Sequence, residues 1–174
     1  MTAKRFLLKA TNSREDLLQR FLNLLARKRA RYCVVGGLAV NAYAEPVVSL
    51  DLDLAVVSDK IEEVLAALPK SWKIRRFPHS INISSSASDL RIQLQLNYRY
   101  QDFIKGARLR TVLGYRMPVA AIENVLQGKI WAYQDKSRRP SKRQKDLADI
   151  FRLVEARPEL TSSLPKDIKS LLPS

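Results

Sequence analysis

Apolar residues at helical spacing over 17–25 predict the first long helix of the chain. Ser13 is expected to cap this helix, with Asp16 at the third helical position in the manner of a capping box. The basic residues 1–12 that precede it are expected to form a partly ordered arm.

The next segment has the pattern of a strand, a tight turn, a short helix and a second strand. Cys33–Val35 is an apolar run that suits a buried strand, and Leu38–Ala44 suits the helix. Over 50–54, aspartates alternate with leucines. The acidic side chains therefore share one face of the second strand, and the leucines share the other.

Strands dominate the middle of the chain. Residues 91–98 alternate strictly between polar and apolar side chains and form the clearest strand in the sequence. Two shorter strands are expected over 72–77 and 81–85, and a hairpin around Gly114 is expected over 107–118.

The C-terminal third has helical spacing from about Ala120, with a break at 138–141. The mixture of strands and helices predicts an α/β (α+β) protein. We expect a core with its N-terminal helix over 1–119 and a C-terminal helical region over 120–174.

Composition excludes several classes of site. The chain has 174 residues, 46% of them hydrophobic, which suffices for one domain with a core. Cys33 and His79 are the only residues of their types, so an internal disulfide, a multi-thiolate zinc site and a histidine metal cluster are excluded. No apolar run reaches the length of a membrane span, and we expect a cytoplasmic protein.

Charge points to polyanionic partners. Thirty-one Lys and Arg stand against 17 Asp and Glu, which gives a net charge of +14. Six cations and no acid occupy 136–145, which predicts a loop that grips phosphates; a solvated basic loop is the alternative. The candidate nucleic-acid contacts are Arg138, Arg139, Lys142 and Arg143.

A glycine pair and an acidic pair carry the most specific chemistry in the sequence. Gly36 and Gly37 form a turn whose bare backbone would let a phosphate approach. Asp51 and Asp53 repel each other unless a cation lies between them, and Mg²⁺ held together with substrate phosphates would meet that need. The alternative is the solvent face of an amphipathic strand.

Lys129 lies in the middle of the apolar stripe of a predicted helix over 121–134. It must either extend to solvent or find an anion. We expect that anion to be a triphosphate, or Asp51, Asp53 or Asp146 when the site is empty. A Lys129→Met variant is expected to fold at least as well as the parent, because methionine extends the stripe.

The next helix adds further candidates. Asp146 and Arg143 are placed to reach the same cleft as Lys129, and Arg143 would steady the triphosphate. Asp149 is expected to point away and to be solvated or to act as a cap.

These motifs resemble those of a known superfamily. A Gly-Gly pair followed by Asp-x-Asp resembles the polymerase β-type nucleotidyltransferases. The strings Lys129-Ile-Trp-Ala-Tyr133 and Lys145-Asp-Leu-Ala-Asp149 are similar to those of AbiE-type and MenT-type nucleotidyltransferase-like proteins, many of them toxins of toxin–antitoxin systems. The resemblance covers roughly residues 31–156.

The resemblance implies a mixed sheet flanked by helices, with a C-terminal helical part that closes a nucleotide cleft. It implies Mg²⁺-dependent transfer of a nucleotidyl group from an NTP to a hydroxyl of RNA, such as tRNA, or of a protein. An antitoxin protein is an implied partner. By motif position, Gly36, Gly37 and Ser49 would meet the NTP, Asp51 and Asp53 would hold two Mg²⁺ ions, and Lys129 and Asp146 would complete the catalytic set.

Two departures from the superfamily pattern keep other functions open. Val47 stands where many relatives carry arginine, and Gln93 and Gln95 stand on the strand that often carries a third carboxylate. A glutamine cannot take the acceptor's proton. The alternatives are a catalytically degenerate module that binds RNA or NTP, and a structural partner for an acidic antitoxin.

Overall fold

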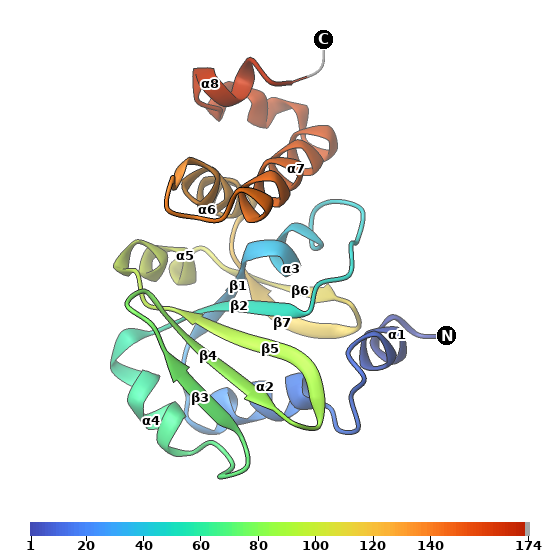
Figure 1. The fold of residues 1–174 in the computed structure, drawn as a ribbon, viewed down its shortest axis with the longest axis vertical. Coiled ribbons are helices and arrows are strands. Elements are labelled where there is room, and N and C mark those ends of the chain that lie inside the picture. Colours follow the sequence, from blue (N-terminus) through green and yellow to red (C-terminus); the bar gives the residue numbers. More distant parts are fainter. Residues whose placement is uncertain (173–174) are drawn as a thin grey trace.

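A mixed seven-stranded sheet runs through the centre of the molecule, in the order β3-β4-β5-β2-β1-β7-β6 (Figure 1). This computed structural model describes residues 1–172. The strands are β1 (Tyr32–Val35), β2 (Asp51–Val56), β3 (Lys73–Arg76), β4 (Ser80–Ser85), β5 (Ser88–Gln95), β6 (Arg108–Val112) and β7 (Tyr115–Val119).

Helices lie on both sides of the sheet, as expected for a mixed α/β fold. They are α1 (Ala3–Ala10), α2 (Leu17–Arg27), α3 (Gly36–Val40), α4 (Ile61–Ala66), α5 (Gln101–Lys105), α6 (Ile122–Gln134), α7 (Pro140–Ala156) and α8 (Lys166–Lys169). Three short 3₁₀ helices are η1 (Ser58–Lys60), η2 (Tyr98–Tyr100) and η3 (Pro158–Ser163). No helix within residues 1–172 is long and apolar enough to cross a membrane.

The two faces of the sheet differ in chemistry. The side chains of one face are fully buried apolar residues, namely Leu52, Leu54, Ile81, Ile83, Ile92 and Leu94. Helix α2 contacts β5 on this side. The opposite face carries the aspartates of β2 and, in register with Asp53 on the parallel strand β5, Gln93. One face of the sheet therefore packs on the core, and the other face is polar and available for a functional site.

Several predicted elements are confirmed, including the hairpin around Gly114, which joins β6 to β7, and the strand over 91–98, which is the C-terminal part of β5 and ends at Gln95. A break separates α6 from α7 as expected, but it spans 135–139 and not 138–141, because α7 already begins at Pro140. The helical region begins with α6 at Ile122, so the boundary between 1–119 and 120–174 stays a prediction, and residues 173–174 lie outside the described residues.

Three local predictions were wrong. The N-terminal segment is not an arm but helix α1, whose Leu7 is buried. The cap of α2 is Asp16, which accepts a hydrogen bond from the backbone N–H of Gln19 at 2.9 Å, whereas Ser13 contacts the Ser88 hydroxyl at 2.6 Å. The basic segment 136–145 is a loop only as far as Arg139, because Pro140 is pre-organised for the first position of α7.

Candidate active site

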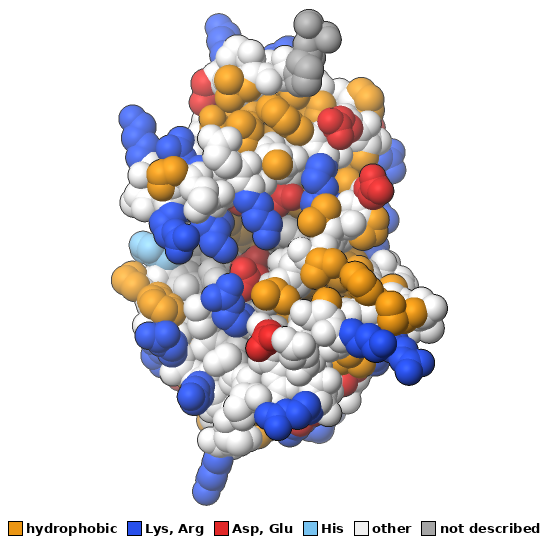
Figure 2. All heavy atoms as spheres, turned by 45° about the vertical axis from the view of Figure 1, so that its right-hand side comes forward, with side chains coloured by type: hydrophobic (Ala, Val, Ile, Leu, Met, Phe, Trp, Pro, Cys, Tyr) orange, Lys and Arg blue, Asp and Glu red, His pale blue; other side chains and the backbone are white. Residues whose placement is uncertain are grey.

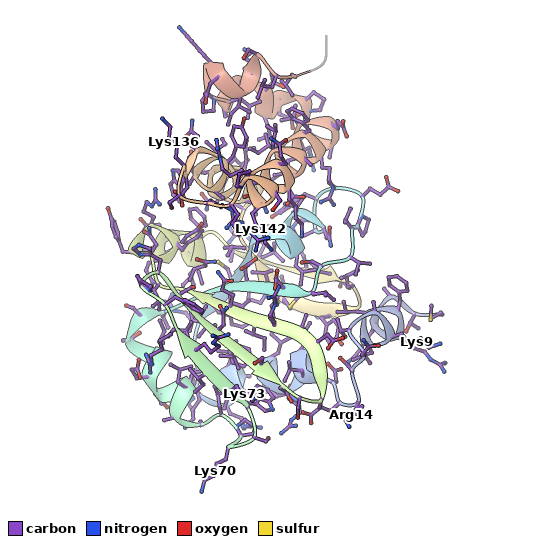
Figure 3. The ribbon with its side chains drawn as sticks, in the orientation of Figure 1. Lys9, Arg14, Lys70, Lys73, Lys136 and Lys142 are labelled. Atoms are coloured by element: carbon purple, nitrogen blue, oxygen red, sulfur yellow. The ribbon has the colours of Figure 1, made fainter. Side chains whose placement is uncertain are left out.

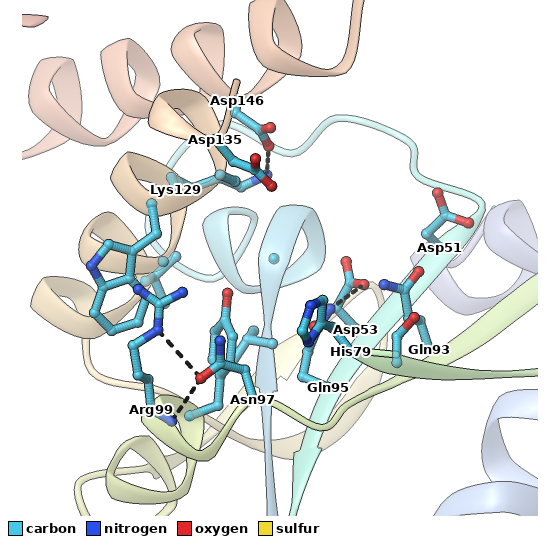
Figure 4. Close-up of a pocket in the computed structure, with 18 of the residues that line it drawn as sticks. Asp51, Asp53, His79, Gln93, Gln95, Asn97, Arg99, Lys129, Asp135 and Asp146 are labelled. Carbon is cyan, nitrogen blue, oxygen red and sulfur yellow. Dashed lines mark hydrogen bonds and ion pairs between the residues drawn. The ribbon is translucent and has the colours of Figure 1, made fainter. Parts of the chain in front are cut away.

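A cavity of about 580 Å³ lies between the polar face of the sheet and the C-terminal helices (Figure 4). Its floor comes from β2, β5 and the first part of β4, and its walls come from η2, α5, α6 and the first two turns of α7. In the space-filling view, Lys and Arg side chains surround a recess in which acidic side chains are visible (Figure 2). The cavity is therefore charged at its mouth.

Gly36 fixes how closely β1 and β2 approach at the cavity floor. It has a φ of +67°, and a Cβ at this position would lie 2.3 Å from Asp53 Oδ2. Only glycine satisfies both the left-handed backbone and the contact. Gly37 is less constrained, since an added Cβ would meet the Ser49 hydroxyl no closer than 3.9 Å. Gly36 lines the cavity, and Gly37 lies behind it.

Asp51 and Asp53 both line the cavity, as the period of the strand predicts. Asp51 pairs with Arg91 at 2.8 Å and lies 3.8 Å from the ammonium of Lys142. Asp53 is held by Gln95, whose amide donates to Oδ1 at 3.4 Å. Desolvation raises the pKa of Asp53 to about 6, with the negative charge of Asp51 acting in the same direction.

The donor set fits Mg²⁺ in chemistry. Two carboxylates share one strand face, and the amide oxygens of Gln93 and Gln95 lie on the neighbouring strand, which together offers the oxygen ligands that Mg²⁺ prefers. Cations already gather around Asp51. Within residues 1–172, no group of three or more His, Cys, Asp or Glu side chains is arranged to hold a metal. A third carboxylate ligand is therefore missing.

Ser49 fixes the backbone at the start of the acidic pair and lies outside the cavity lining. Its buried hydroxyl exchanges hydrogen bonds with the backbone N–H and carbonyl of Asp51, both at 3.2 Å. It does not line the cavity, so in this structure it positions β2 and does not face a ligand.

Lys129 is buried and lines the cavity, where its ammonium binds two carboxylates. It lies 3.0 Å from Asp146 and 2.7 Å from Asp149. Burial alone would lower the pKa of Lys129, but the two carboxylates outweigh burial and the pKa is raised. The partner Asp146 was among those expected.

The prediction for Asp149 was wrong. The side chain is 5% exposed and also pairs with Arg152 at 2.7 Å. The helical pattern of α7 alone could not show this, because the partner of Asp149 comes from α6. The structure argues against the expectation that Lys129→Met folds at least as well as the parent, since that expectation took no account of a second buried carboxylate.

The charges around Lys129 form a network that reaches the loop before β2. Arg138 pairs with Asp146 at 2.6 Å. On the other side, Arg152 donates to Asn41 Oδ1 at 2.9 Å and to the carbonyl of Glu45. The side-chain amide of Asn41 in turn bonds the backbone of Val47 twice: its Nδ2 donates to the carbonyl, and its Oδ1 accepts from the N–H. Helix α7 therefore holds the loop that delivers Ser49 and the acidic pair, through residues that the sequence patterns did not single out.

The four residues predicted to contact nucleic acid do not lie together in the structure. Arg138 and Lys142 line the cavity. Arg143 does not, since its Nε donates to the carbonyl of Tyr133 at 2.7 Å and its guanidinium lies over that ring. Arg139 is exposed at the start of α7, outside the cavity. The structure therefore brings Arg138 and Lys142, but neither Arg143 nor Arg139, to the acidic pair.

The far end of the cavity is aromatic, which sequence reasoning missed. Tyr100, Phe103 and Trp131 contact one another with ring centroids 5.1 to 5.9 Å apart, and Arg99 lies 4.2 Å from the centre of the Trp131 ring. The three rings come from η2, α5 and α6, so no single periodic pattern links them. His79, the single histidine of the chain, also lines the cavity (Figure 4).

No protein-family model and no curated protein matches the sequence. Solved structures match its fold. ANT(2″)-Ia, in complex with adenylyl-2″-tobramycin, has a TM-score of 0.59 and 12% identity over 89% of this chain and 92% of that chain. The lincomycin-bound lincosamide antibiotic adenylyltransferase LnuA has a TM-score of 0.55 and 13% identity over 81% and 98%.

A third match is an antigenic nucleotidyltransferase-like protein from Paracoccidioides brasiliensis, with a TM-score of 0.52 and 16% identity over 84% and 90% of the two chains. At such identities the likeness is one of fold alone, and the narrower resemblance to AbiE-type and MenT-type proteins stays a prediction. The chain has the nucleotidyltransferase fold.

Proposed function

We propose that the protein is a Mg²⁺-dependent nucleotidyltransferase that moves a nucleotidyl group from an NTP to a hydroxyl of RNA. The observation that carries the proposal is the pair Asp51 and Asp53 on one strand face, at the floor of a cavity whose opposite wall presents Arg138 and Lys142. Carboxylates for a metal and cations for phosphates thus face one space.

The two ends of the cavity suit the two parts of a nucleotide. Arg138 and Lys142 would neutralise the triphosphate, and the aromatic end of the cavity, where Arg99 lies over the Trp131 ring, would receive the base. Lys129 has three donor hydrogens, two of which its carboxylate partners occupy, which leaves one for a phosphate oxygen.

In the proposed reaction the acceptor oxygen attacks the α-phosphorus in line, and pyrophosphate leaves. Asp51 and Asp53 would hold Mg²⁺, which when bound neutralises charge on the triphosphate. Gln93 and Gln95 cannot accept the proton of the attacking hydroxyl, so that proton must go to water or to Asp53. We therefore expect slow turnover.

Incorporation of labelled NTP into total RNA, with Mg²⁺ and with EDTA, tests the proposal. Asp51→Asn and Asp53→Asn should each reduce transfer at least a hundredfold, on the scale of losing a group that acts only in the transition state. Asp102→Asn is the matched control, because this exposed aspartate of α5 lies outside the cavity lining. Unchanged transfer in both site variants would refute the assignment.

A catalytically degenerate module that binds NTP or RNA is the second candidate. It is favoured by the glutamines on β5 and by the ion pair between Arg91 and Asp51, in which the guanidinium engages the carboxylate that a metal would need. The same assay separates the two functions, since NTP binding without Mg²⁺-dependent incorporation would support the module.

If the AbiE-type and MenT-type resemblance extends to function, the enzyme acts as a toxin, and its basic surface would bind an acidic antitoxin.

A further inference from the structure

The polar face of the sheet continues beyond the cavity to the edge of the molecule. Its register runs from Asp53 on β2 to Gln93 on β5, then to Asn82 on β4 and to Arg75 on β3. A second row on the same face pairs Ser84 of β4 with Lys73 of β3. Residues at paired register positions of neighbouring strands point to the same side, so these side chains form one continuous surface.

No helix in the described part of the chain crosses the β3–β4–β5 portion of this face (Figure 1). Helix α4 lies on the opposite side, since its Glu62 binds Arg76, which shares the apolar face with Ile81. In Figure 3, Lys142 on α7 lies above the sheet and Lys73 on β3 lies at its lower part. The face is therefore accessible from the cavity to β3.

Outside the acidic pair, the charged side chains of the open face are cations except for Asp89 at its end. Lys73 and Arg75 are exposed, and neither forms an ion pair within residues 1–172. Arg91 is also exposed and lines the rim of the cavity, where it pairs with Asp51. The only acid in strands β3 to β5 is Asp89, at the far end of β5, where Asn12 donates to it at 2.6 Å.

The dimensions suit a short stretch of nucleic acid. Three strand spacings separate β2 from β3, which is roughly 14 Å. A stacked single strand rises 3.4 Å per nucleotide, so the face accommodates about four nucleotides before the reacting end. Hydroxyl and amide groups between the cations can donate hydrogen bonds to phosphate and ribose.

We propose that this face, defined by Lys73, Arg75, Asn82, Ser84, Arg91 and Gln93, binds the single-stranded RNA segment that ends in the acceptor hydroxyl. The proposal rests on the proposed function for the identity of that end. The sugar–phosphate backbone lies across β4 and β5, with Arg75 and Lys73 on the upstream phosphates, and the terminal hydroxyl reaches Asp51 and Asp53.

The test is the affinity of a fluorescently labelled single-stranded RNA 8-mer, measured by anisotropy at several salt concentrations. The variant Lys73→Ser/Arg75→Ser should bind roughly tenfold more weakly, and its log–log salt slope should flatten by about 1.4 for two lost phosphate contacts. Its affinity for NTP should be unchanged, because neither residue lines the cavity. Both side chains are exposed, so the melting temperature should not change.

Arg76→Ser is the matched control, since it removes one cation from the same strand on the opposite face. An equal loss of RNA affinity in the control and the double variant would overturn the proposal, and so would unchanged binding in the double variant. A polyglutamate peptide that displaces the RNA at equal charge would also overturn it, in favour of an acidic protein partner. Because binding is measured without turnover, failure of nucleotidyl transfer alone refutes only the proposed function.

Discussion

At the scale of single residues, the site depends on how tightly Asp53 is enclosed. The absence of a side chain at Gly36 lets the carboxylate pack against the turn after β1. That contact removes water from Asp53 and raises its pKa to about 6. A metal ion bound at Asp53 would offset this cost.

A pH-dependent gain in stability should follow from Asp53→Asn. The pKa of Asp53 is higher in the folded state than in the unfolded state, so folding loses stability as pH rises from about 4 to about 6. In EDTA at pH 7.5, the variant should therefore raise the free energy of unfolding by on the order of 2 kcal/mol, and at pH 4 it should give no gain. Urea denaturation at both pH values measures the difference, with Asp102→Asn as control. An equal gain at both pH values would contradict the enclosed-carboxylate argument.

Residues whose position follows from local periodicity were predictable from sequence. Asp51 and Asp53 share a face because strand side chains alternate, and both line the cavity as expected. Arg143 was placed in the cleft on helical spacing alone, yet the carbonyl of Tyr133 on α6 holds its guanidinium away. Spacing tells which side of a helix a residue occupies, and not which neighbouring polar group captures it.

At the scale of elements, buried charges join α6 to α7 and both to the loop before β2. Three cations, Arg138, Lys129 and Arg152, surround two carboxylates with very little exposure to water. Such a network gives little net stability compared with an apolar core, but its partial removal leaves a buried charge unpaired. The same side chains that face the ligand therefore also fix the helices that carry them.

Lys129→Met should destabilise the fold by about 3 kcal/mol, because Asp149 and Asp146 lose their shared partner. Adding Asp149→Asn should restore part of that loss, since it removes one uncompensated charge. Urea unfolding of the two single variants and the double variant gives the coupling energy. Lys105→Met, at an exposed lysine paired only with Asp102, should change stability by less than about 1 kcal/mol. A Lys129→Met variant as stable as the parent would show that the network does not hold α6 to α7.

The order and type of the main elements followed from hydrophobic patterning, whereas their junctions did not. The hairpin over 107–118 and the strand over 91–98 are present, but α1 was missed because it is fixed by a segment far along the chain: Gly114 of the hairpin lies against the backbone of Lys4. The aromatic end of the cavity was missed for the same reason, since its rings meet only after α6 packs beside α5 and η2. The hydrophobic pattern of one segment does not predict its contacts with segments that are distant in sequence.

At the scale of the whole molecule, which has a net charge of +14, cations and acids are distributed unevenly around the candidate site. Exposed cations continue from the cavity mouth along the open sheet face, while the acidic pair lies at the cavity floor. Such a field would raise the local concentration of a polyanion and align it toward the carboxylates. It would disfavour a polycationic acceptor in the same place.

RNA binding by the intact protein should be steeply salt-dependent. Without NTP, when no triphosphate engages Arg138 and Lys142, five cations face the proposed path, namely Lys73, Arg75, Arg91, Arg138 and Lys142. If each neutralises one phosphate of a single strand, the affinity should fall on the order of a hundredfold between 50 and 200 mM salt. Anisotropy titrations with the same 8-mer across that range measure the slope, and an uncharged RNA analogue with a neutral backbone serves as the control. An affinity that stays constant with salt would mean that the positive charge of the molecule does not act on RNA, and that the acceptor must be sought among neutral hydroxyl compounds instead.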